Sequence, residues 1–139
     1  MDSERLQLRP IGRVESELED PATAPKQGDE GAPEAAIVVD HAFVAALDGL
    51  APGDEAIVLT WLDRADREVL TVHPRGDALR PQQGVFATRS PHRPNPIGLH
   101  RVRILAIEGN LLRVADLEAL HGTPVLDLKP VLSADSEER

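Results

Sequence analysis

The sequence predicts a mainly β, single-domain fold, an antiparallel or mixed β-barrel with one short helix. The chain of 139 residues suits one domain with a moderate core. Short apolar and β-branched runs alternate with turn-forming residues, which is typical of small barrels. Only 2% of the residues are aromatic, so we expect a core of Val, Ile, Leu and Ala. The barrel is expected to span 8–132, between flexible tails at 1–7 and 133–139.

The first half of the chain contains two strand-like segments, a long loop and the helix. Residues 8–16 read as a short strand, and 19–34 are rich in Pro, Gly and charge, which predicts a loop. Residues 37–39 are apolar and β-branched. Asp40 can then cap a short helix that ends near Leu47, before a glycine.

The second half carries most of the strand signals. These are apolar runs bounded by turn residues: 56–62, 68–73, 84–88, 99–107, 111–115 and 125–128. We expect a turn at 65–67 to join the first two runs. Glu108-Gly109-Asn110 has the composition of a hairpin turn between 99–107 and 111–115.

Charge is distributed unevenly along the chain. The net charge of −9 argues against a general nucleic-acid binder. Residues 78–107, however, contain no Asp or Glu and five arginines, a basic tract that can attract an anionic ligand. Arg101 and Arg103 alternate with apolar residues, so they are alternatively solvated positions on a strand.

Several classes of site are disfavoured by what the sequence lacks. No cysteine is present, which excludes disulfides and thiolate metal sites. The five histidines show no metal-ligand spacing, so we expect no metal site and treat each as structural or solvated. There is no G-x-G, Walker A or G-x-S-x-G motif, which disfavours Rossmann, P-loop and hydrolase chemistry. Without a leader or a membrane-spanning run, a cytoplasmic location is expected.

The most informative segment is 84–99, a loop stiffened by Pro91, Pro94 and Pro96. Proline fixes φ and disfavours helix at the preceding residue, so 90–96 cannot form a helix. Five polar side chains are thereby held in fixed places: Arg89, Ser90, His92, Arg93 and Asn95. Such rigidity lowers the entropy that binding a ligand would cost.

A second polar turn follows at 117–130. Gly122-Thr123-Pro124 is a restricted turn, and Asp127 and Lys129 then point to one face of an extended segment. The two charges alternatively form no more than a surface ion pair. Two rigid polar turns in one small domain favour a shared ligand site.

Together these motifs resemble the TsaA-like, or TrmO, family. The resemblance rests on four segments and on two weaker N-terminal motifs, and covers about Leu8 to Leu132: Gly84–Pro91, Arg93–Gly98, Gly122–Pro124 and Asp127–Pro130, with Pro10–Gly12 and Pro25–Gln27. The chain departs from the usual pattern at His121, where the family has Asp, and at Asp54-Glu55, where it has Ser-His. It also ends soon after the last motif, where longer members carry a second domain.

The resemblance implies S-adenosylmethionine bound to a β-barrel, in a homodimer with the cofactor near the subunit interface. It further implies methylation of the exocyclic nitrogen of threonylcarbamoyladenosine in tRNA. Two alternatives stay open: a methyltransferase of a small molecule, and an S-adenosylmethionine-binding module without enzymatic activity. The acidic composition favours the first of these alternatives.

On this basis we assign candidate roles to the polar residues of both turns. A carboxylate is best held by Arg or backbone N–H groups, and an adenine edge can be read by the main chain of a rigid turn. The residues expected to bind the cofactor are Arg89, Ser90, His92, Arg93, Asn95, Leu117, His121, Gly122 and Thr123. The residues expected to orient the acceptor or handle its proton are Asn95, Asp127 and Lys129.

Overall fold

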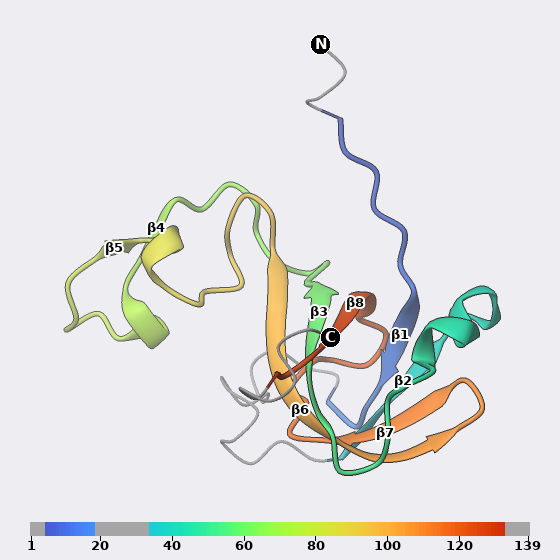
Figure 1. Ribbon diagram of the computed structural model, residues 1–139. Helices are drawn as coiled ribbons and strands as arrows, with labels where there is room; N and C mark the ends of the chain where they lie inside the picture. Colours follow the sequence, from blue (N-terminus) through green and yellow to red (C-terminus); the bar gives the residue numbers. More distant parts are fainter. Residues whose placement is uncertain (1–4, 19–33, 133–139) are drawn as a thin grey trace.

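Six strands close into an antiparallel barrel in the order β1-β2-β7-β6-β3-β8 (Figure 1). The structure, a computed structural model, describes residues 5–18 and 34–132. The barrel strands are β1 (Gly12–Glu15), β2 (Ala35–Val39), β3 (Glu55–Trp61), β6 (Ile97–Glu108), β7 (Leu111–Ala115) and β8 (Pro124–Pro130). The predicted mainly β barrel is confirmed. Much of the predicted loop at 19–34, and most of both predicted tails, lie outside the described residues, and the domain boundaries stay predictions.

The barrel interior is aliphatic. Alternate residues of each strand point inward, as in β6, where Gly98, His100, Val102 and Ile104 are buried and the residues between them are not. The buried residues of the core cluster are Val, Ile, Leu and Ala without exception among the described residues. Burial of these side chains supplies the main driving force for closing the barrel.

Strands β6 and β7 form a hairpin, and the longer strand β6 extends beyond it to pair with β3. Gly109 turns the chain with a φ of 63°, a left-handed conformation that glycine adopts without steric penalty. The hairpin is as predicted, although β6 begins at Ile97, two residues early. Pairing with β7 covers only Arg103 to Glu108, whereas residues 97–103 of β6 pair with β3. The first half of β6 therefore has one side that β7 does not cover.

The short helix predicted after Asp40 also forms where it was expected. It is a 3-10 helix, η3 (His41–Leu47), and the Asp40 carboxylate accepts a hydrogen bond from the Ala42 N–H at 3.0 Å. Leu47 anchors its end in the core. In the described part of the chain, no helix has the length and hydrophobicity needed to cross a bilayer.

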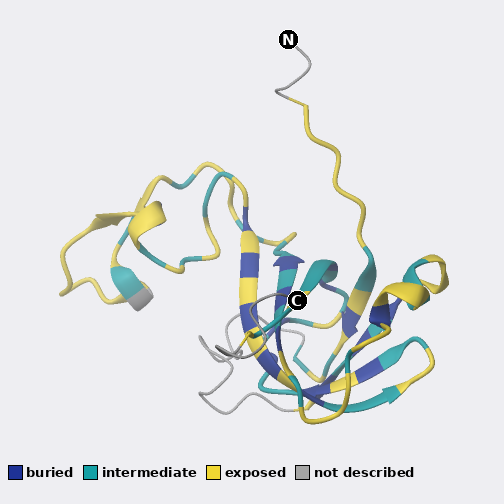
Figure 2. Cartoon of the chain, viewed as in Figure 1, coloured by how far each residue is buried: buried dark blue, intermediate teal, exposed yellow. Residues whose placement is uncertain are grey.

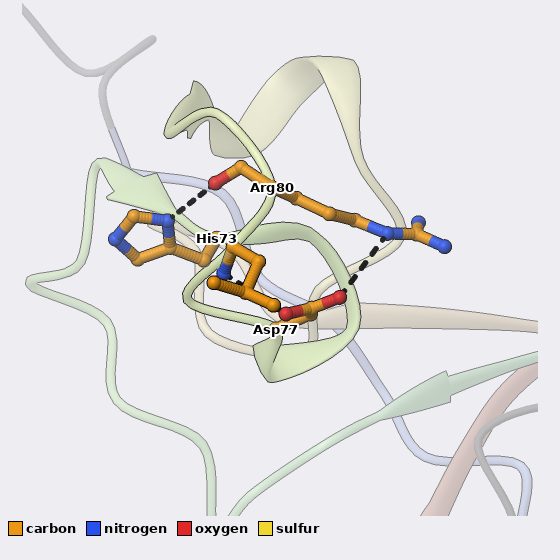
Figure 3. Close-up of polar contacts among 4 residues, drawn as sticks. His73, Asp77 and Arg80 are labelled. Carbon is orange, nitrogen blue, oxygen red and sulfur yellow. Dashed lines mark hydrogen bonds and ion pairs between the residues drawn. The ribbon is translucent and has the colours of Figure 1, made fainter.

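Residues 62–96 form an arm that projects from the barrel (Figures 1 and 2). It contains the two-residue strands β4 (Thr71–Val72) and β5 (Gln83–Gly84), which pair with each other, and the 3-10 turns η4 (Pro74–Gly76) and η5 (Val85–Ala87). Figure 2 shows that most of the arm is exposed. Local polar contacts hold it, such as His73 Nδ1 to the Arg80 carbonyl at 2.8 Å and Arg80 to Asp77 at 3.8 Å (Figure 3).

The arm is where the sequence-based strand assignments were wrong. Residues 68–73 do not pair with β3 through a turn at 65–67, because β3 pairs with β6 and β8. Only Thr71 and Val72 of that run are in a strand. The predicted strand at 84–88 gives way to η5, which closes with a Thr88 N–H to Val85 O bond of 3.0 Å. Both runs have strand-like composition but lie on the arm, where no core selects the extended form.

Arg101 and Arg103 are solvated strand positions. They point outward from β6, and Arg101 binds Glu55 through Nε and Nη2 at 2.9 and 3.2 Å. The Arg101 guanidinium lowers the pKa of Glu55 below its ordinary value by hydrogen bonding and charge. These two arginines thus fit the second interpretation given above, and neither lines the pocket described next.

Candidate functional site

A pocket of about 300 Å³ lies beside the first half of β6. It is bounded by the loop at 88–96, called here the proline-arginine loop, and by the turn after β7. Its volume is in the range of small-molecule sites. The two polar turns that the sequence singled out therefore contribute to one cavity. The lining residues come from the base of the arm, the loop, β6 and the turn: 62–65, 89–93, 97–100, 118–120 and Thr123.

Five of the residues predicted to bind a cofactor line this pocket. They are Arg89, Ser90, His92, Arg93 and Thr123. Arg89 is exposed and, among the described residues, has no hydrogen-bond or ion-pair partner. Its guanidinium is therefore available to an anionic group.

Arg93 organises the proline-arginine loop from within. Its Nη1 donates to the carbonyls of Thr88 and Ser90, both at 3.0 Å. The Ser90 N–H donates to Thr88 Oγ1 at 3.1 Å, and the His92 N–H donates to Ser90 Oγ at 3.2 Å. Proline removes backbone donors here, and these contacts satisfy several of the remaining groups.

The base of the arm fixes His92. The Asp66 N–H donates to His92 Nδ1 at 3.0 Å, so a neutral His92 carries its proton on Nε2 and can donate from there. Arg67 Nε donates to the Pro94 carbonyl at 2.7 Å, and the Leu62 N–H donates to the Pro96 carbonyl at 2.8 Å. The two ends of the arm are thereby joined next to the pocket.

A buried polar relay in the pocket wall was missed by the sequence analysis. His100 binds Thr60 Oγ1 through Nε2 at 2.7 Å and contacts Glu118 Oε1 through Nδ1. An ionised carboxylate only accepts, so Nδ1 donates to Glu118, and a neutral ring then accepts the Thr60 hydroxyl at Nε2. The signal was present in the alternation of β6, which places His100 inward with Val102 and Ile104.

Gly98 makes room for this relay. Gly98 lies opposite Thr60 in the β3–β6 register. A Cβ on Gly98 would lie 2.7 Å from His100 Nε2 and closer still to Thr60 Oγ1. The glycine that ends the Arg93–Gly98 motif is thus needed for space, because its missing side chain admits the Thr60–His100 hydrogen bond.

Three other predicted cofactor residues lie outside the pocket lining. Leu117 is fully buried in the core. The His121 N–H donates to the Leu18 carbonyl at 2.6 Å, and its Nδ1 accepts from the Ser16 N–H at 3.2 Å. Gly122 is joined to the Val14 carbonyl at 2.8 Å. This turn is therefore fastened to β1 and the residues after it, and the assignment of the three residues to a cofactor stays a prediction.

The three residues predicted to serve the acceptor also lie outside the lining. Asn95 is exposed and its Oδ1 accepts from Arg67 Nη2 at 3.1 Å. Asp127 and Lys129 form an ion pair of 3.3 Å on β8, opposite Leu59 and Ile57 of β3. The shared face that the sequence predicted for this pair is confirmed, while their catalytic role stays a prediction.

Of the residues that the structure describes, no group of three or more His, Asp or Glu could hold a metal ion. The pocket instead combines cationic and hydrogen-bonding groups with apolar walls and the carboxylate of Glu118.

Comparison with known proteins assigns the family. Residues 13–136 match the family model described as the N-terminal domain of tRNA-methyltransferase O. The chain belongs to this family. The matched region contains the proline-arginine loop, the relay and the turn at 118–123; the Pro25–Gln27 motif lies outside the described residues.

Relatives of similar length carry names that refer to a ligand. A probable S-adenosyl-L-methionine-binding protein of Methanothermobacter thermautotrophicus is 43% identical over 130 residues, covering 94% of this chain and 93% of the relative. An S-adenosyl-L-methionine-binding protein of Archaeoglobus fulgidus is 43% identical over 122 residues, covering 88% of this chain and 86% of the relative.

Solved structures of TrmO share the fold. The crystal structure of TrmO from Pseudomonas aeruginosa superimposes with a TM-score of 0.74 at 29% identity, over 96% of this chain and 59% of that one. Another TrmO crystal structure gives 0.74 at 31% identity, over 96% and 62%. This chain therefore spans about three fifths of the solved TrmO chains.

Proposed function

We propose that this protein is an S-adenosylmethionine-dependent methyltransferase that methylates the exocyclic nitrogen of threonylcarbamoyladenosine in tRNA. The observation that carries the proposal is the pocket between the proline-arginine loop and the turn at 118–123, in a member of the TrmO N-terminal family. The names of the similar archaeal proteins support the choice of cofactor.

The donor set of the pocket fits this cofactor. Arg89 is available for the carboxylate of the methionine portion, and His92 Nε2 can donate a hydrogen bond. Apolar walls at Leu62, Leu99 and Leu120 suit the flat adenine. The sulfonium carries the methyl group that the acceptor nitrogen takes.

The residues of this chain bind the cofactor, position the acceptor and accept the proton that is released. Arg93 keeps the loop rigid, so that methyl and nucleophile meet in line at low entropic cost. Asn95 and Lys129 would orient the acceptor by donating hydrogen bonds, and the Asp127 carboxylate would receive the proton that the acceptor nitrogen loses. Replacing Asn95 or Lys129 by Ala then lowers turnover with little change in Tm, and wild-type turnover in both variants would remove them from the mechanism.

The distribution of charge supports tRNA as the acceptor. The arm contains six arginines against four acidic residues, in a chain of net charge −9. A basic arm on an acidic body can bind phosphate locally while limiting nonspecific binding. The overall acidity favours the second candidate, methylation of a small molecule.

Two experiments separate the candidates. Mass spectrometry of tRNA nucleosides from a strain lacking this gene is expected to show loss of methylated threonylcarbamoyladenosine; an unchanged level would favour the small-molecule acceptor. Binding of tRNA to the purified protein is expected to weaken steeply with salt, because phosphate contacts release counterions. Calorimetry that detects S-adenosylmethionine binding without methyl transfer to any acceptor would favour a binding module.

The proposed assembly is a cytoplasmic homodimer. The outer face of β3 and β6 carries Ile97 and Leu99, 45% and 49% exposed, beside the half-buried Ile57, Leu59 and Trp61. An apolar sheet face of this kind suits a second copy of the chain. Sedimentation equilibrium is expected to give twice the chain mass, and Ile57→Glu, on the same face but outside the pocket lining, is expected to shift it to the monomer. Cell fractionation tests the location.

A further inference from the structure

Glu118 is the less exposed of the two acidic side chains that line the pocket. Its side chain is 15% exposed, whereas the other acid of the lining, Asp63, is exposed. One oxygen, Oε1, is taken by His100. The other, Oε2, accepts no hydrogen bond from any described residue. A negative charge with a free oxygen is therefore held in a partly dry site.

The relay fixes where this charge lies. Thr60 is fully buried on β3 and His100 is 5% exposed on β6, so both strands of the barrel wall orient the Glu118 carboxylate. Gly98 leaves the space that the Thr60–His100 bond requires. Burying polar groups costs free energy unless each is hydrogen-bonded. A hydrogen-bonded carboxylate placed beside a pocket therefore indicates a role in binding.

We propose that Glu118, held by His100 and Thr60, recognises the positive charge of the cofactor's sulfonium, so that the pocket prefers S-adenosylmethionine to its uncharged demethylated product. The inference rests on the proposed function and adds a specificity-determining residue to it. His100 and Thr60 are positioning residues.

The other groups of the cofactor suit Glu118 less well. The ammonium and the carboxylate of the cofactor's methionine portion share one carbon. Binding of that carboxylate by Arg89 at the exposed loop therefore keeps the ammonium there too. A ribose diol is best held by two oxygens of one carboxylate, and His100 already occupies one of them. The sulfonium offers no N–H or O–H donor and needs only a nearby negative charge between apolar walls, which Glu118, Ala119 and Leu120 supply.

The consequence is easier release of product. Methyl transfer removes the positive charge from sulfur, and the attraction to Glu118 is lost in the same step. A pocket that distinguishes the two states by charge binds the reactant more tightly than the product, although the molecules otherwise share nearly every atom.

The test is the ratio of two dissociation constants, measured by calorimetry for S-adenosylmethionine and S-adenosylhomocysteine. The ratio is the Kd for S-adenosylhomocysteine divided by the Kd for S-adenosylmethionine, and we expect it to exceed one in wild-type protein. Glu118→Gln is expected to weaken S-adenosylmethionine binding by about tenfold or more while changing S-adenosylhomocysteine binding by less than about threefold. The matched control is Asp63→Asn, which removes one negative charge from an exposed residue of the same lining. It is expected to leave the ratio near that of wild type. Thr60→Val is expected to lower the ratio by a smaller factor.

The outcomes distinguish the two proposals. If wild-type protein binds neither molecule, the proposed function fails and this inference fails with it. If wild-type protein binds S-adenosylmethionine no more tightly than S-adenosylhomocysteine, only the sulfonium assignment is overturned. It is also overturned if Glu118→Gln weakens both molecules equally or if Asp63→Asn has the same effect on the ratio. The wild-type comparison decides even if Glu118→Gln does not fold.

Discussion

The barrel and the arm are stabilised by different interactions, apolar burial in the barrel and polar contacts in the arm. The barrel closes six strands around buried aliphatic side chains, whereas only Val85 and Pro96 are buried among the arm residues whose exposure is described. The arm relies on short polar links, such as Arg67 to Pro94 and Arg93 to Thr88. Burial shared by all six strands stabilises the barrel as one unit, whereas hydrogen bonds with little burial around them allow the arm to open at lower free energy. The pocket lies where the two regions meet.

The largest expected difference between the regions is in global stability. Ile37→Ala, at a fully buried barrel position, is expected to lower the free energy of unfolding by about 2–5 kcal/mol, because it leaves a cavity. Leu79→Ala, at a 94% exposed position on the arm, is expected to change it by less than about 0.5 kcal/mol. Urea denaturation monitored by circular dichroism measures both. Equal losses would contradict the contrast between barrel and arm.

Gly98→Ala is expected to have the next largest effect. The new Cβ overlaps Thr60 Oγ1 and His100 Nε2, and overpacking of this kind costs about 1–3 kcal/mol. The double variant Gly98→Ala/Thr60→Ala removes the tightest contact, so the two changes are expected to be less destabilising together than the sum of their separate effects. Strict additivity in urea denaturation would show that Gly98 is not required by the relay.

Arg93→Ala tests the arm by function instead of stability. Loss of its bonds to Thr88 and Ser90 is expected to loosen the loop and weaken S-adenosylmethionine binding by about tenfold. Global unfolding is expected to change by less than about 1 kcal/mol, because the arm contributes little buried area. Calorimetry and urea denaturation together measure the two effects. A large loss of global stability would show that arm and barrel unfold as one unit.

The smallest expected effect is at the Glu55–Arg101 pair on the outer barrel surface. Arg101 lowers the pKa of Glu55 below its ordinary value, so the pair stabilises the fold at pH values above the pKa of the unfolded carboxyl, and the contribution is lost as pH falls through the folded pKa. Glu55→Gln is therefore expected to lower Tm slightly at neutral pH, in a salt-sensitive way, and to match wild type in strong acid. Calorimetric melting across this range tests it; a difference that grows in acid would contradict the sign.

Sequence reasoning succeeded where one physical pattern dominated. Alternation and the Glu108-Gly109-Asn110 turn were enough for the β6–β7 hairpin, and proline chemistry was enough for the irregular loop at 90–96. It failed at 68–73 and 84–88, because strand composition does not reveal whether a core lies beside the segment.

The candidate site was predictable only in part, for a similar reason. Polar residues clustered in one loop, such as Arg89 and Arg93, are visible in the sequence. The relay is not visible in the same way, because Thr60, His100 and Glu118 lie 40 and 18 residues apart and meet only when the barrel closes. Each of the three alone has the appearance of an ordinary strand or loop residue.

Trp61 gives the protein a built-in optical reporter. It is the only tryptophan, and the sequence contains no tyrosine. Trp61 is the last residue of β3, where the arm begins, and the Arg67 guanidinium lies 5.1 Å from the centre of its ring. Ultraviolet emission excited at long wavelength therefore comes from this junction alone. Movement of the arm can be followed in unlabelled protein, in real time, because no second tryptophan and no tyrosine adds to the signal.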